Sequence, residues 1–184
     1  MQIGPYHSHE MVLCSADAGP DSQRDLPGQA QFFFPKGKWV GTLRNVADRL
    51  SCDFLILTTQ HGLVEPHQII APYDLHINHY RQEVTEKWIA TIPPLMQGAR
   101  YKLIIFYAGG CPRDEMIEIM LPILKQHGVA LLTFGRPNMF DSDKIDDIWS
   151  MLMRGTTDEE IMSILKIPER FRYYPIDDIV IKQS

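Results

Sequence analysis

Residues 102–114 have the sequence KLIIFYAGGCPRD, in which a short apolar run passes through a glycine-rich turn into a helical pattern. A run of this kind is typical of a strand buried on both faces, because a buried helix needs about 10–12 residues. Similar runs occupy residues 11–14, 54–59 and 129–134. The sequence therefore predicts four buried strands.

Helical patterns separate these runs. Residues 39–50 and 112–127 repeat apolar side chains at steps of three and four, and the second segment starts with a proline and ends before Gly128. Residues 85–96 carry Trp88, Ile89, Ile92 and Leu95 on one face, although Pro93 and Pro94 should kink or break that helix. The alternation predicts a three-layer α/β fold, with a mostly parallel central sheet of about four to five strands and helices on both faces.

The pattern changes after residue 140. Asp141 and Asp143 are expected to cap a helix that Gly155 ends, and Thr157 with Glu160 forms a capping-box pattern for a second short helix. We therefore expect residues 1–140 to form the α/β domain and residues 141–184 to form a small helical extension packed on it. No internal repeat or low-complexity tract is visible in the sequence, and the longest irregular region is residues 19–38.

The composition excludes several classes of protein. The chain has 184 residues, of which 45% are hydrophobic, and a net charge of −5 argues against general coating of nucleic acid. No apolar run approaches the roughly 18–20 residues of a transmembrane helix, and the first residues lack the features of a signal peptide. Three cysteines without repeated spacing indicate reduced thiols. We expect a cytoplasmic protein with no membrane partner.

Ligands of open α/β sheets bind outside the carboxyl ends of the strands. The turns that follow the four predicted strands therefore define the candidate site. A strand-to-helix turn at Gly109 and Gly110 offers backbone N–H groups to a phosphate or a polarised carbonyl. Cys111 could be a nucleophile there, but a helix cap or a packing residue is the favoured interpretation. The substrate-binding candidates from these turns are Ser15, Gly62, Gly109, Gly110, Arg113, Arg136 and Asn138.

The sequence also offers two kinds of histidine site. His61 directly follows a strand and is the candidate for acid–base chemistry. His76 and His79 have the spacing of one helical turn and could contribute to a zinc site, but the pattern around them favours extended chain with the two side chains on opposite faces. No tight metal-binding signature is present, so we expect neither a metal site nor a cofactor.

Basic and aromatic residues alternate at residues 166–174, as in some nucleic-acid contacts. Residues 141–184 nevertheless carry six basic and ten acidic residues, which weakens that interpretation. A tail that packs Phe171 and Tyr174 onto the main domain is the favoured alternative, and a nucleic acid would have to use a local patch.

Residues 62–75 have the sequence GLVEPHQIIAPYDL, directly after the second predicted strand. The pattern G-L-x-x-P-x-x-x-I-x-P-Y-D-L resembles the hallmark of a bacterial and phage family of unknown function related to the YaaA peroxide-stress proteins. The resemblance extends over about residues 11–140. Such proteins carry a lysine shortly after a Cys-Ser pair, whereas Cys14-Ser15 is followed here by Ala16, Asp17 and Ala18. Lys36 or Lys38 could replace that lysine.

The resemblance implies a nucleobase or nucleotide ligand, since YaaA-type proteins are linked to DNA binding and to protection against oxidative damage, and related α/β domains resemble base-excising glycosylases. Tyr73 would stack on a base and Asp74 would pair with its edge. An enzyme of N-glycosidic chemistry, with His61 or Asp74 as the acid–base group, is the leading hypothesis. A non-catalytic nucleotide-binding module that uses the same cleft is the alternative, and a rigid structural turn at residues 72–74 is a third.

Overall fold

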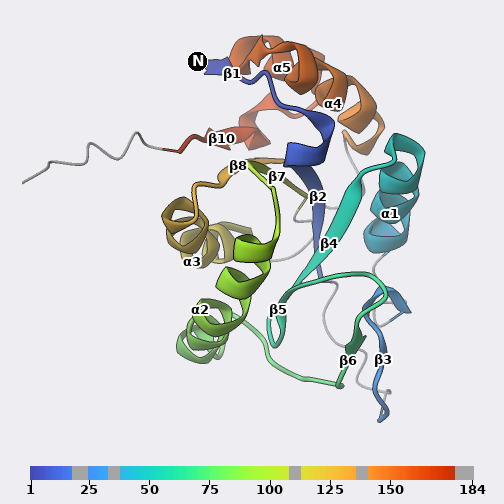
Figure 1. Cartoon of the computed structure of the whole chain (residues 1–184), viewed down its shortest axis with the longest axis vertical. Coiled ribbons are helices and arrows are strands. Elements are labelled where there is room, and N and C mark those ends of the chain that lie inside the picture. Colours follow the sequence, from blue (N-terminus) through green and yellow to red (C-terminus); the bar gives the residue numbers. More distant parts are fainter. Residues whose placement is uncertain (18–24, 33–37, 108–112, 136–140, 177–184) are drawn as a thin grey trace, which may run out of the picture.

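The computed structural model describes residues 1–17, 25–32, 38–107, 113–135 and 141–176 of the chain. Its centre is a six-stranded sheet with the strand order β10-β8-β7-β2-β4-β5 (Figure 1). The four inner strands are parallel to one another and coincide with the four predicted runs: β2 (Met11–Ala16), β4 (Asp53–Thr58), β7 (Leu103–Tyr107) and β8 (Ala130–Phe134). The predicted three-layer α/β fold is confirmed.

Antiparallel strands border the parallel set on both sides. Strand β5 (Gly62–Val64) pairs with β4, and β10 (Arg172–Tyr174) pairs with β8. Two small sheets lie outside the main one, pairing β1 (Gln2–Ile3) with β9 (Thr156–Thr157) and β3 (Gly28–Gln29) with β6 (Ile69–Ile70). The sequence predicted a helical C-terminal extension. That prediction is only partly right, because β10 of this extension belongs to the central sheet.

The central sheet separates two apolar layers. One layer lies under α1 (Lys38–Leu50), α4 (Ile145–Arg154) and α5 (Asp158–Ile164), and the other under α2 (Arg81–Gly98) and α3 (Arg113–Gln126). Successive strand residues alternate between the layers: Leu13 faces the first and Cys14 the second, and both are completely buried. This burial on both faces explains why the inner strands read as continuous apolar runs.

Helix α2 is not broken at Pro93 and Pro94, one of the two predicted outcomes, because it continues through both residues. The two prolines remove the hydrogen bonds to the carbonyl groups of Ile89 and Ala90, which lie on the exposed side of the helix where water can solvate them. Burial at intervals of four residues holds the helix against the sheet through Val84, Trp88, Ile92 and Met96. The prediction that Ile89 lies on the buried apolar face is wrong, since this residue is 58% exposed.

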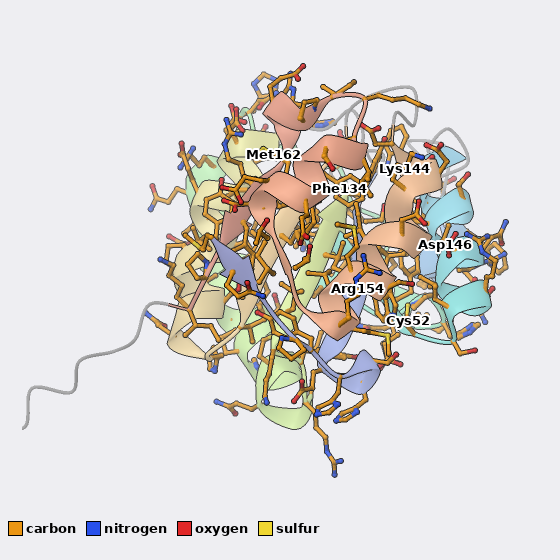
Figure 2. All side chains as sticks on the ribbon, turned by 90° about the horizontal axis from the view of Figure 1, so that it is seen from above. Cys52, Phe134, Lys144, Asp146, Arg154 and Met162 are labelled. Atoms are coloured by element: carbon orange, nitrogen blue, oxygen red, sulfur yellow. The ribbon has the colours of Figure 1, made fainter. Side chains whose placement is uncertain are left out.

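The C-terminal segment packs on the first apolar layer. Figure 2 shows its helices, with Lys144, Asp146, Arg154 and Met162 labelled, lying over the sheet that carries Phe134. Phe171 is buried in the same layer and Tyr174 packs against the other, as predicted for the tail. Short 3₁₀ turns occur at Ser8–Glu10, Ala30–Phe32, Ser142–Lys144 and Pro168–Arg170.

The caps of these helices are partly as expected. Gly155 ends α4, and the Thr157 hydroxyl accepts from the Glu160 amide in the predicted capping box of α5. Asp141 is different, because its carboxylate makes no cap and instead accepts from the amides of Lys166 (2.6 Å) and Ile167 (3.1 Å). It thereby ties the segment before α4 to the segment after α5.

The strand order changes direction between β2 and β7. Numbered along the chain, the parallel strands lie in the order 2-1-3-4 across the sheet. The chain leaves β2 toward β4 through α1 on one face, and it leaves β7 toward β8 through α3 on the other face. The carboxyl ends of β2 and β7 are therefore the switch point, where doubly wound sheets bind their ligands.

Candidate functional site at the carboxyl edge of the sheet

Asp17 directly follows β2 at the switch point, and its side chain is buried, with the residue only 3% exposed. Its backbone N–H donates to Leu57 across the strand ends (2.8 Å). Its Oδ2 accepts from the Thr59 backbone N–H (3.2 Å) and from the Tyr73 hydroxyl (2.7 Å). Buried carboxylates require such donors, because an isolated buried charge is costly. Ser15 was the candidate predicted from this turn and Asp17 was not, although a carboxylate directly after a buried strand is visible in the sequence.

Tyr73 joins Asp17 to His61. Its ring is partly buried against both apolar layers, and it meets the imidazole of His61 edge-on, with ring centroids 5.4 Å apart. The His61 Nε2 lies 3.1 Å from the Ala71 carbonyl oxygen. A carbonyl only accepts, so Nε2 carries the proton of this bond, and in the neutral ring Nδ1 is an acceptor. His61 and Tyr73 were both candidates from the sequence, and the structure brings their rings into contact.

A second aromatic side chain reaches the same strand end. Trp39, in the first turn of α1, donates from its indole Nε1 to the carbonyl oxygen of Ala16 (3.1 Å). The indole is therefore fixed beside the residue that precedes Asp17. Two planar rings, Trp39 and Tyr73, thus contact adjacent residues at the carboxyl end of β2.

Other predicted binding residues have structural roles. Ser15 is completely buried and donates to the carbonyl oxygen of Ala16 (2.8 Å), so its hydroxyl is directed into the strand rather than toward a ligand. Gly62 has a φ of +68°, and a Cβ at this position would overlap the side chain of Thr91 on α2. Its glycine is therefore explained by the tight β4–β5 turn and the close helix.

Asp74 does not join Asp17, Tyr73 and His61 in a contact. Its side chain is 82% exposed, and its Oδ1 lies 3.1 Å from Nε2 of His76. The prediction of extended chain beyond Asp74 is wrong. The chain turns there, because the amides of His79 and Tyr80 both donate to the His76 carbonyl. That turn brings the rings of His76 and His79 to 6.4 Å, on the same side.

The Asp74→Asn substitution is expected to change the free energy of unfolding by less than about 1 kcal/mol, since an exposed ion pair contributes little. Chemical denaturation of the variant and the parent protein measures the difference. A loss above about 2 kcal/mol would mean that the carboxylate holds buried amide groups together.

Several predicted residues cannot be compared with this geometry. Gly109, Gly110, Arg136 and Asn138 lie outside the described residues, as does Cys111, and Arg113 is described only as the first residue of α3. In the described part of the chain, no group of three or more His, Cys, Asp or Glu side chains could hold a metal ion.

The two described cysteines are poor nucleophiles. Burial raises the pKa of the Cys14 thiol well above its usual range, and burial together with the nearby Asp53 carboxylate raises the pKa of Cys52 to about 11. Both side chains are therefore thiols at neutral pH. None of the helices among the described residues has the length and hydropathy to cross a membrane.

Comparison with known families gives one match. The model of a family described as "Family of unknown function (DUF6884)" matches residues 18–134, which is more than half of the chain. No curated protein and no solved structure matches. The matched region contains Tyr73 and His61 and begins one residue after Asp17.

Proposed function

Since the chain belongs to the family of unknown function DUF6884, we propose its function from its site: it binds a nucleobase, as the free base or within a nucleoside or nucleotide, beside Asp17 at the carboxyl ends of β2 and β4. The observation that carries this proposal is the buried carboxylate of Asp17 at the switch point, held by Thr59 and Tyr73.

The chemistry of the site suits the edge and the face of a base. A carboxylate has about four lone-pair positions and accepts from the ring N–H and amino groups that bases present on their edges. Tyr73 and Trp39 contribute flat rings for stacking. Both rings are fixed by hydrogen bonds, so little conformational entropy is lost on binding.

The resemblance of residues 62–75 to proteins related to YaaA supports the same ligand class. The motif forms β5, β6 and the segment that brings Tyr73 to Asp17. In this proposal Asp17, rather than Asp74, pairs with the edge of the base, because Asp74 is exposed and lies against His76. A DNA or RNA base is the polymeric form of this ligand.

The proposed reaction is hydrolysis of the N-glycosidic bond. The bond between the base nitrogen and C1′ of the sugar breaks, water adds its oxygen to C1′, and the base leaves with a proton. Asp17 would stabilise the positive charge that develops on the sugar, and His61 Nδ1 would accept the proton of the attacking water.

A non-catalytic binding module is the second candidate, and one observation favours it. The Tyr73 hydroxyl already donates to Asp17 at 2.7 Å, so two of the polar groups are occupied by each other. Such a pair is suited to recognition by shape and stacking without a chemical step.

The test is a thermal-shift screen of nucleobases, nucleosides and nucleotides, because a ligand that binds the folded state raises Tm. We expect a shift in the parent protein that is lost in His61→Ala and Asp17→Asn and kept in His79→Ala, an exposed histidine away from Asp17. Chromatographic detection of released base then distinguishes the enzyme from the binding module. The proposal fails if no compound of the screen raises Tm, or if Asp17→Asn retains the full shift.

A further inference from the structure

Two hollows lie at the opposite edge of the sheet. Asp53 is the first residue of β4, Glu65 follows antiparallel β5, and Tyr101 precedes β7, so all three lie at the amino end of the parallel strands. Two surface hollows, of about 390 and 500 Å³, share these three residues. Each volume is within the usual range for a small-molecule site.

A polar wall of the smaller hollow is built from side chains whose donor directions are fixed. Arg44 on α1 donates from Nη1 to Oε1 of Gln31 (2.5 Å), because a guanidinium only donates. The Gln31 amide nitrogen therefore faces Nδ1 of His67 (3.1 Å), which accepts. In the neutral ring of His67, the proton is then on Nε2, so the wall presents donors. The Gln31 backbone N–H, bound to the Pro66 carbonyl at 3.0 Å, holds this wall in place.

Arg44 lacks a counterion in the part of the chain that the structure describes. Its guanidinium has no carboxylate within ion-pair distance there, and its Nε is buried without an acceptor. Partly buried cations normally have an anionic partner, since burial of an uncompensated charge is unfavourable. The remaining donors of Arg44 and His67 thus suit a carboxylate, to which arginine binds with two parallel hydrogen bonds.

The hollow is also lined by acidic side chains. Asp53 accepts from the Tyr101 hydroxyl (2.7 Å), and burial together with this carboxylate raises the pKa of Tyr101 well above its usual range, so the phenol stays neutral. Asp48 and Glu65 line the same hollow. Three carboxylates repel a purely anionic ligand such as phosphate, whereas a purely cationic ligand would leave Arg44 uncompensated.

We propose that this hollow binds a free α-amino acid with an apolar side chain. Its carboxylate pairs with Arg44 and His67, its ammonium faces Glu65 and Asp53, and its side chain lies against the apolar lining of Cys52, Phe54 and Pro66. The hollow is separate from the proposed nucleobase site at Asp17, because the length of the parallel strands lies between them. It does not depend on the function proposed for that site.

The test uses L-leucine and two analogues that each lack one charge: 4-methylpentanoate, without the ammonium, and 3-methylbutylamine, without the carboxylate. Isothermal titration calorimetry on the full chain should show binding of leucine and about tenfold or more weaker binding of each analogue. Equal affinity for the three compounds, or no binding of leucine, would overturn the proposal.

Variants locate the site. Arg44→Gln should weaken leucine binding about tenfold or more, and Glu65→Gln should weaken it as well. The matched control is Arg49→Gln on the same helix, because Arg49 is paired with Asp146 (2.5 Å) and does not line the hollow. Equal effects of Arg44→Gln and Arg49→Gln would contradict the assignment. Shifts of Tm by nucleobase ligands should be the same in Arg44→Gln as in the parent, which separates failure here from failure of the first proposal.

Discussion

Replacing Asp17 by alanine is expected to lower the free energy of unfolding by about 2–4 kcal/mol, because two donors lose a buried acceptor at once. The Thr59 N–H and the Tyr73 hydroxyl both donate to Oδ2 of Asp17, and Thr59 is only 4% exposed. Water therefore replaces the carboxylate poorly at the Thr59 amide. Urea denaturation followed by circular dichroism measures the loss.

Tyr73→Phe is the matched control for this experiment. It removes one of the two donors and keeps the ring, so it should cost only about 0.5–1.5 kcal/mol. Asp17→Asn keeps an acceptor oxygen and should fall between the two variants. If Asp17→Ala were no more destabilising than Tyr73→Phe, the bond to Thr59 would contribute nothing and Asp17 would have no organising role at the strand ends.

The Gly135→Ala substitution is expected to destabilise the protein by about 2–5 kcal/mol, the sum of left-handed backbone strain and overpacking. Gly135 follows β8 with a φ of +79°, and an added Cβ would overlap the ring of Tyr107. That ring is completely buried and packs edge-on against Phe134, with centroids 5.9 Å apart, so a shift of the ring would disturb this packing.

Gly128→Ala separates the two contributions. Gly128 also has a positive φ, of +68°, but a Cβ there would meet nothing within 4 Å. Only the backbone strain remains, so the expected loss is about 1–2 kcal/mol. Thermal and urea denaturation of both variants measure the difference, and equal losses would show that Tyr107 accommodates the methyl group.

The inner strands could be predicted from the sequence because each is buried on both faces and therefore apolar at consecutive positions. Strands β5 and β10 could not, because three residues give no period, and β10 is defined only by its pairing with Leu131–Thr133 of β8. Helix α2 was misjudged for a different reason. The sequence showed both the penalty of Pro93 and Pro94 and the apolar face with Trp88 and Ile92, but not that the burial of that face outweighs the penalty.

The site was only partly predictable. The rule for strand ends selected the turn after β2, where Asp17 lies, and the motif at residues 62–75 selected Tyr73. The sequence motif could not show that Tyr73 contacts Asp17, fifty-six positions earlier in the chain, because that contact depends on the tertiary path of β5 and β6. Arg44 gave no signal at all, since a lone arginine on a helix usually faces water.

The alternation of strand residues between two apolar layers has a consequence for how mutations combine. Leu13, Ile105 and Leu132 stand side by side on three neighbouring strands and share one layer, whereas Val12 and Cys14 face the other. Energetic coupling requires contact or a shared cavity. Epistasis should therefore link residues on neighbouring strands that face the same layer, and along one strand it should skip every second residue. Natural substitutions at Leu13 should covary with those at Ile105 and be independent of those at Val12 and Cys14.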